Sequence, residues 1–221
     1  MKKSSSLCRI LLLFYGIILI LFFSACRKNT EFFSITEYDK DAWRLDQSIN
    51  LYNTDLNIFL TIPRGWWIHD LNTANLSPDP ADTVDASTFD IIHNENSDYM
   101  FLASFANSKL QQRKKFIKYE LFTALNEKNH YFDFFDYYFP ENDSFRQFSL
   151  LETGSITIDE IVFQKTVAEV SNSGEKSMIA IFITKLESGH YLLIIVSYWQ
   201  KNKEAANIIT NFLSSALKLQ H

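Results

Sequence analysis

Cysteine, glycine and proline are scarce in this sequence of 221 residues, which contains two, five and four of them respectively. So little glycine and proline excludes a collagen-like or low-complexity chain. The glycines form no GxGxxG or Walker spacing, and no GxSxG elbow occurs. The sequence therefore gives no support for nucleotide binding of those kinds or for an α/β-hydrolase. The longest uncharged apolar run, Ile10–Phe23, has 14 residues, whereas a membrane-spanning helix needs about 20.

The residues that are abundant are those of a folded core. Hydrophobic residues make up 47% of the chain, and the aromatic residues comprise 20 Phe, 10 Tyr and 4 Trp, which excludes an intrinsically disordered protein. The formal net charge is −5 and the pI is about 5.5, so general binding to the nucleic-acid backbone is not expected. This length fits one domain of ordinary size.

The start of the chain predicts export and a lipid anchor. Basic residues precede the apolar run Ile10–Phe23, which has the length of a signal-peptide core, and Ser24-Ala25 supply small residues before Cys26. A small-small-Cys ending of this kind resembles the lipobox of bacterial lipoproteins, although Phe23 stands where that motif usually has Leu. The alternative is an ordinary secretory signal or an uncleaved anchor.

We therefore expect three parts: a lipoprotein signal peptide over residues 1–25, a lipidated tether over 26–40, and a single domain over 41–221. Cys26 would carry the lipid, for example palmitate, in the bacterial cell envelope, with the outer membrane favoured over the inner. Removal of Lys2, Lys3 and Arg9 takes the formal charge from −5 to −8. Cys8 is removed too, so an exported chain would keep neither a disulfide nor a free thiol nucleophile.

Hydrophobic periodicity predicts the elements of the domain. The pattern gives strands at 56–62 and 99–105, a long polar loop at 71–88, and a helix at 108–127 with Leu110, Ile117, Leu121 and Leu125 on one face. Three meandering strands follow at about 160–171, 177–186 and 190–199, joined by turns at 172–175 and 187–189. The chain then forms an amphipathic helix over Ala205–Leu217, whose apolar residues include Phe212 and Leu213.

This order of elements predicts an α+β fold, a mostly antiparallel sheet flanked by helices. A strand runs into Ile62-Pro63-Arg64-Gly65-Trp66, and Gly189-His190-Tyr191 opens an apolar strand before the last helix. With these features the chain resembles the PsbP-like superfamily over about residues 50–219. That resemblance implies an α/β/α sandwich and a non-catalytic accessory or binding module.

Titratable residues offer little evidence of a catalytic or metal site. The histidines have no i, i+4 pair and no cysteine of the exported chain can join them, so we expect no metal and no cofactor. Two acidic groups are candidates for a carboxylate pair across a glycan cleft, but a solvated acidic surface is the ordinary interpretation. These acids are Asp79, Asp82, Asp85, Asp90, Asp133, Asp136, Glu141 and Asp143.

A basic cluster lies at the start of the predicted helix. No acid occurs between Lys109 and Lys118, a stretch that holds five basic residues. The functional interpretation is a contact for anionic lipid head groups or an acidic partner, and the alternative is a solvated face.

Seven aromatic residues lie between Tyr131 and Pro140. They either fill the core beneath a long connection or form an exposed partner surface, because Tyr and Phe are common at binding sites. With the Trp66-Trp67 turn as a neighbour, the candidate partner surface comprises Trp66, Trp67, Tyr131, Asp133, Phe135, Asp136, Tyr137 and Tyr138.

We therefore expect a membrane-anchored envelope lipoprotein that acts as a non-catalytic binding or accessory module. Its expected partners are the membrane, through Cys26, and an envelope protein or glycan. The alternatives are a carboxylate-dependent hydrolase of envelope glycans, and an assembly factor or chaperone for another envelope protein.

Overall fold

The computed structural model describes residues 42–73, 75–78, 99–112, 114–125, 146–172 and 175–219. The chain divides into two units, Met1–Tyr38 and Asp39–His221, and every described residue belongs to the second. The predicted signal peptide, Cys26 and the tether therefore lie outside the described residues.

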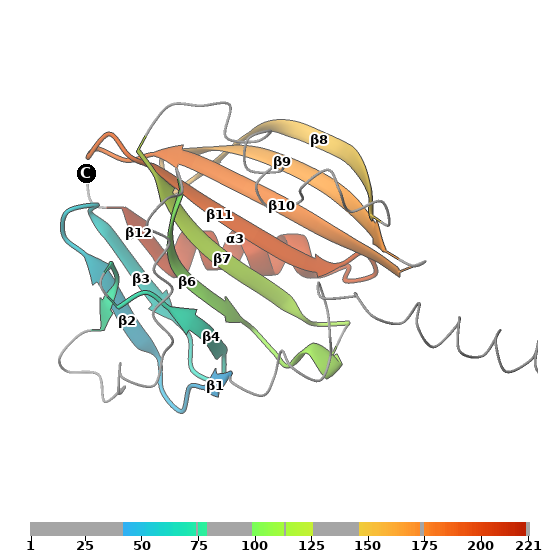
Figure 1. Ribbon diagram of the computed structural model, residues 1–221, viewed down its shortest axis with the longest axis horizontal. Coiled ribbons are helices and arrows are strands. Elements are labelled where there is room, and N and C mark those ends of the chain that lie inside the picture. The colour runs from blue at the N-terminus through green and yellow to red at the C-terminus, as the bar shows by residue number, and fades with distance from the viewer. Residues whose placement is uncertain are drawn as a thin grey trace, which may run out of the picture. The chain divides into compact units, whose positions relative to one another are not determined.

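An eight-stranded sheet, named here the large sheet, forms most of the second unit (Figure 1). Its neighbouring strands are all antiparallel, in the order β1-β4-β6-β7-β11-β10-β9-β8. The strands, taken in that order, are β1 (Trp43–Arg44), β4 (Trp67–Leu71), β6 (Tyr99–Ala106), β7 (Ile117–Ala124), β11 (Tyr191–Trp199), β10 (Glu175–Lys185), β9 (Ile161–Asn172) and β8 (Arg146–Ile158).

A second, four-stranded sheet has the order β12-β3-β2-β5 and is also antiparallel. Its strands are β12 (Leu217–Leu219), β3 (Ile58–Ile62), β2 (Ile49–Asn53) and β5 (Ser77–Pro78). Alternate residues of β2 and β3 are fully buried, which is the period expected of strands with one face on a core.

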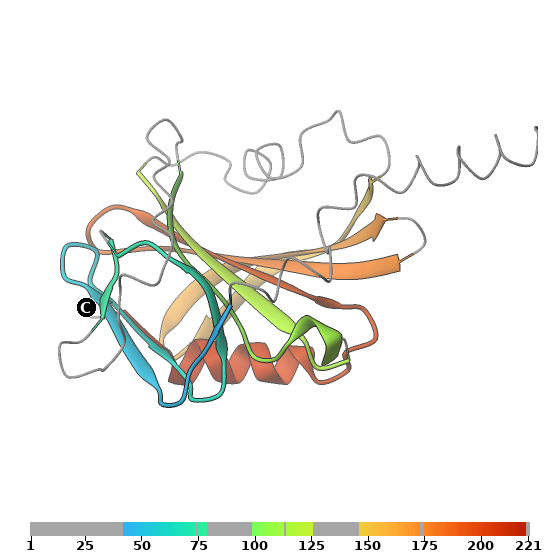
Figure 2. The same cartoon turned by 60° about the horizontal axis from the view of Figure 1, so that its bottom comes forward.

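The helix α3 (Ala205–Ser215) runs along one face of the large sheet (Figure 2). Its buried residues are Ala205, Ile209, Phe212 and Leu213, spaced as on one side of a helix. No helix in the described parts of the chain is long and apolar enough to cross a membrane. A 3-10 turn, η2 (Leu110–Gln112), completes the helical structure there.

One continuous core joins both sheets and α3. Four stacked or tilted rings lie in it, and the ring of Tyr119 is central. Its centroid is 4.4 Å from that of Phe212, 5.3 Å from Trp66 and 5.4 Å from Phe105. The predicted burial of Phe212 and Leu213 is therefore confirmed.

The large sheet is apolar on its other face as well. Phe122 on β7, Ile181 on β10 and Leu193 on β11 are buried but do not belong to the core that contacts α3. Because side chains of a strand alternate between faces, these residues lie on the face directed away from the helix, named here the far face.

The predicted fold class is wrong, because in the described parts of the chain the one α-helix lies on a single face of the large sheet, whereas the sequence predicts helices on both faces. The described residues form twelve strands, one α-helix and one 3-10 turn, with α3 on one face of the large sheet, rather than an α/β/α sandwich. The mostly antiparallel sheet is the part of that prediction that holds.

The helix expected at 108–127 accounts for much of this error. Its place is taken by η2 and β7, and Leu125, expected on the buried face of a helix, is 70% exposed. β7 lies between β6 and β11 and is buried on both faces. Ile117, Tyr119 and Leu121 alternate with Lys118 and Glu120, which is the period of a strand and competes with the helical spacing of Ile117 and Leu121.

The other predicted strands and the final helix are confirmed. The strand at 56–62 is β3 and that at 99–105 is β6. The three meandering strands are β9, β10 and β11, with Gly189 (φ +87°) in the last turn, and the final helix is α3. The loop at 71–88 contains the end of β4 and all of β5, and its part from 79 onward lies outside the described residues.

Candidate functional site

A cleft of about 430 Å³ opens where β1, the turn before β4 and the β6–β7 connection meet. We name it the basic cleft. The described residues that line it are Arg44, Gly65, Trp67, Asn107, Ser108, Lys109 and Gln112.

Strand pairing places Arg44 and Trp67 side by side. They are directly opposite partners in the β1–β4 ladder, so their side chains lie on the same face with Cβ atoms about 5 Å apart. The partner of Trp67 on its other side is Ala106 of β6, whose small side chain leaves room for the indole ring. The cleft is therefore built around a half-buried tryptophan beside an exposed guanidinium.

The turn before β4 depends on Gly65. Its φ is +84°, in the left-handed region that residues with a Cβ rarely adopt. Its N–H donates to the carbonyl of Leu45 at 2.8 Å, and the N–H of Leu45 donates to the carbonyl of Trp66 at 2.8 Å. These bonds hold β1 and β4 together at the cleft.

Asn107 fixes the opposite wall. Its Nδ2 donates to the carbonyl of Lys115 at 2.9 Å, and its Oδ1 accepts the N–H of Ile117 at 2.9 Å and the hydroxyl of Ser108 at 3.2 Å. The Asn107 side chain thus joins the two ends of the β6–β7 connection by hydrogen bonds to the backbone, as short polar side chains often do at turns. Lys109 lies within this connection, and its Nζ is 4.4 Å from the centroid of the Trp67 ring.

The electrostatic character of the cleft is positive. Arg44 and Lys109 supply two cations, and the lysines at 114 and 115 are exposed on the same connection. The described lining contains no Asp, Glu, His or Cys. Its other polar groups are a hydroxyl and two carboxamides, so the lining supplies charge, hydrogen-bond donors and an aromatic face, which suit recognition of an anion.

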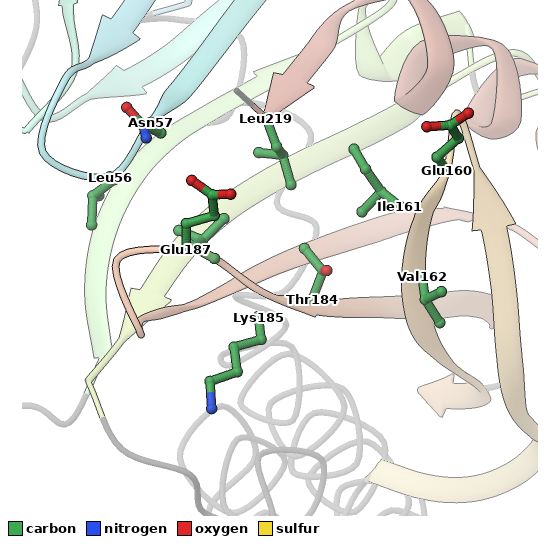
Figure 3. Close-up of a pocket in the computed structure, with 10 residues that line it drawn as sticks. Leu56, Asn57, Glu160, Ile161, Val162, Thr184, Lys185, Glu187 and Leu219 are labelled. Atoms are coloured by element: carbon green, nitrogen blue, oxygen red, sulfur yellow. The ribbon is translucent and has the colours of Figure 1, made fainter. Parts of the chain in front are cut away.

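A second cavity, of about 260 Å³, lies between the β2–β3 turn, the start of β9, the end of β10 and β12 (Figure 3). Two glutamates line it, Glu160 and Glu187, and Figure 3 shows aliphatic side chains, including Leu219 and Ile161, between them. Glu160 has φ +70° in the two-residue β8–β9 turn, a conformation that usually selects Asn or Gly. This cavity has an apolar floor and two acids held apart.

A buried ion pair lies on the far face near the cleft. Lys118 donates to Glu120 at 2.6 Å, and both side chains are largely buried. Lys118 is the register partner of Ala106, which in turn is the partner of Trp67. This pair uses one of the basic residues that the sequence grouped together, so Lys118 is a structural cation here.

Two tyrosines have perturbed acidity. Burial raises the pKa of Tyr119 well above its usual range, and its hydroxyl makes no hydrogen bond within the described structure. Burial also raises the pKa of Tyr198, with a smaller contribution from the charge of Glu152. Neither residue lines the basic cleft. No group of three or more His, Cys, Asp or Glu residues in the described ranges is placed to hold a metal ion.

The two tryptophans of the candidate partner surface are separated. Trp67 lines the basic cleft, whereas Trp66 is stacked against Tyr119 and Phe212 in the core. The remaining members of that surface, and all eight candidate acids, lie outside the described residues. The surface residues are Tyr131, Asp133, Phe135, Asp136, Tyr137 and Tyr138. Two of them, Asp133 and Asp136, are also candidate acids, and the other six acids are Asp79, Asp82, Asp85, Asp90, Glu141 and Asp143.

Sequence reasoning missed Arg44, Asn107 and Gln112. Arg44 joins the cleft only through the β1–β4 ladder, and a two-residue strand leaves no periodic signal. Asn107 forms hydrogen bonds to nearby backbone groups, and an asparagine next to a turn is a sequence signal for such bonds.

Comparisons with known proteins give a structural likeness but no match in sequence. The chain matches no protein-family model, and no curated protein matches its sequence. It is similar to the solution structure of cyanobacterial PsbP (CyanoP) from Synechocystis sp. PCC 6803, with a TM-score of 0.47 and 11% sequence identity. The alignment covers 78% of this chain and 93% of that chain. At this TM-score and identity, neither a family nor an activity follows from the likeness.

Proposed function

We propose that this chain is a lipid-anchored protein of the bacterial cell envelope whose sheet domain binds a partner without transforming it. The anchor rests on the sequence: a basic start, a short apolar run and Ser24-Ala25-Cys26. The binding role rests on the basic cleft.

The observation that carries the proposal is the lining of that cleft. Trp67 is the strand partner of Arg44, and the Nζ of Lys109 lies over its ring, 4.4 Å from the ring centroid. Tryptophan and arginine contribute most of the binding energy at many interfaces. The described lining holds no Asp, Glu, His or Cys beside Ser108, so no carboxylate or imidazole base is placed there to activate its hydroxyl. Its cations, amides and indole ring suit recognition of an anionic group.

The Figure 3 cavity supports a hydrolase less well. Glycosidic cleavage needs two carboxyl groups that face one bond across a cleft. Glu160 and Glu187 lie on opposite sides of the cavity with aliphatic groups between them. The basic cleft is therefore the better candidate for the functional site.

Co-purification from membranes tests the proposal. The full chain is isolated with its neighbours after mild cross-linking, in wild-type form, as Trp67→Ala and as Trp43→Ala. Trp43 is a matched control because it lies on the adjacent strand, is 41% exposed and does not line the cleft. We expect Trp67→Ala to lose a partner that Trp43→Ala keeps. The same partners in all three samples would contradict the assignment of the cleft.

A further inference from the structure

We infer that the basic cleft takes the phosphate of an anionic lipid head group, at the surface of the membrane that holds the anchor. This inference rests on the proposed function, since it names the ligand of the same cleft. Three features support this ligand: the charge of the cleft, its tryptophan and the short stretch of chain between the cleft and the anchor.

The charges suit phosphate. Arg44 offers a planar guanidinium that matches two phosphate oxygens, and Lys109 offers a point charge over the Trp67 ring. Gln112 and Ser108 add uncharged polar groups, and no described lining residue is acidic. Two further exposed cations, Lys114 and Lys115, follow on the same connection. A cationic surface with no opposing carboxylate favours a phosphate head group of net negative charge over a zwitterionic or neutral one.

The tryptophan suits a membrane surface. Indole rings concentrate at the head-group level of bilayers, where an apolar body and a polar N–H are both accommodated. Trp67 is half-buried in the cleft, and the exposed cations Arg44 and Lys109 line the same cleft. Each Lys or Arg held near an anionic bilayer increases the partition of a protein from water to the bilayer surface about fivefold.

The chain length brings the cleft within reach of the bilayer. Arg44 follows Cys26 by 18 positions, which allows a separation of at most about 60 Å when extended. Of the strands that line the cleft, β1 is the one that follows the tether directly in sequence. An anchor on Cys26 therefore keeps the cleft at a high effective concentration near head groups.

Quenching of Trp67 fluorescence by acrylamide tests the inference. The full chain is reconstituted into vesicles of phosphatidylcholine alone and of phosphatidylcholine with phosphatidylglycerol at 7:3. The contribution of Trp67 is the difference between wild type and Trp67→Phe. We expect its quenching constant to fall at least twofold in the anionic vesicles and to recover in 0.5 M NaCl, because added salt screens charges at a surface.

Charge variants identify the cleft. Arg44→Gln with Lys109→Gln should abolish the difference between the two vesicle types. Lys203→Gln with Lys218→Gln makes the same change in net charge at exposed residues outside the cleft and should preserve it. If these control lysines matter as much as the cleft cations, the inference is wrong, because attraction would then follow net charge alone.

A third arm separates a lipid from a soluble phosphate. Here sn-glycerol 1-phosphate at 10 mM is added to the phosphatidylcholine vesicles. Equal protection of Trp67 by this soluble probe would overturn the lipid assignment in favour of a soluble phosphate ester. Equal quenching in both vesicle types, with no effect of the probe, would overturn the phosphate assignment altogether. A partner lost by Trp67→Ala in the co-purification would still support the proposed function in either case.

Discussion

Replacing Phe212 with alanine should lower the free energy of unfolding of the domain by about 4 kcal/mol, since Phe→Ala in a packed core costs about 3–5 kcal/mol. The side chain is 4% exposed and lies where α3 meets the large sheet. Its ring centroid is 4.4 Å from Tyr119, 5.3 Å from Trp66 and 5.5 Å from Phe105. Such aromatic pairs contribute about 0.5–1.5 kcal/mol each beyond burial, which keeps the estimate above the lower end of the range.

Urea unfolding followed by circular dichroism measures this loss. With an m-value of about 2 kcal/mol/M, the midpoint should fall by about 2 M urea while m stays constant. Phe212→Leu keeps part of the volume and should cost about half as much as the alanine variant. Asn211→Ala, on the exposed side of α3, is the matched control and should change stability by less than about 0.5 kcal/mol.

A loss below about 1 kcal/mol for Phe212→Ala at constant m would refute this reasoning. It would mean that α3 is not held by the ring cluster, and that the amphipathic pattern of 205–217 was misassigned to the core.

Three further predictions test other parts of the molecule. Cys26→Ala should abolish labelling by a fatty-acid probe, processing of the precursor and the lipid-dependent association with membranes; an unlabelled wild-type chain would contradict the anchor. Gly65→Ala should destabilise the domain by about 1–2 kcal/mol, because an alanine at this left-handed φ is strained. No heavy atom lies within 4 Å of the added Cβ, so a steric clash adds nothing to this loss. Equal melting temperatures of variant and parent would show that the turn adapts. Burial raises the pKa of Tyr119, so above about pH 10 the tyrosine ionises in the unfolded chain but not in the folded one, and the free energy of unfolding should decline. Tyr119→Phe should show a smaller decline. Parallel curves of stability against pH for the variant and the wild type would contradict this prediction.

The parts of the fold that sequence predicts well are those with local signals. The strands β9, β10 and β11 are separated by turn residues, and α3 has a clear helical period with Phe212 and Leu213 on the buried side. In each case the hydrophobic period and the turn residues that define the element lie within the element or a few residues from its ends.

The failures come from long-range pairing. The spacing of Ile117 and Leu121 predicts a helix, whereas pairing with β6 and β11 on both sides requires the strand β7. β8 gave no signal because most of its described residues are exposed at the sheet edge. The four-stranded sheet includes β5 and β12, which are too short to leave a period.

The candidate site was found in part. The basic cluster and Trp67 were identified from the sequence, and the structure places Lys109 over the Trp67 ring. Trp66 and Trp67 are adjacent at the start of β4, and alternation sends one toward the core and the other into the cleft. Which of them faces the core depends on the ladder with β6, and that pairing is not encoded locally.

The central claim is that this chain is an anchored envelope protein and binds its partner through the basic cleft. Photo-crosslinking in living cells tests this claim most directly. A benzoyl-phenylalanine replaces Gln112 at the rim of the cleft, or Ser155 on the exposed edge strand β8 as a matched control. We expect an adduct from position 112 alone, and its loss when Arg44→Gln and Lys109→Gln are added. No adduct at position 112, or one that persists without both cations, would contradict the account.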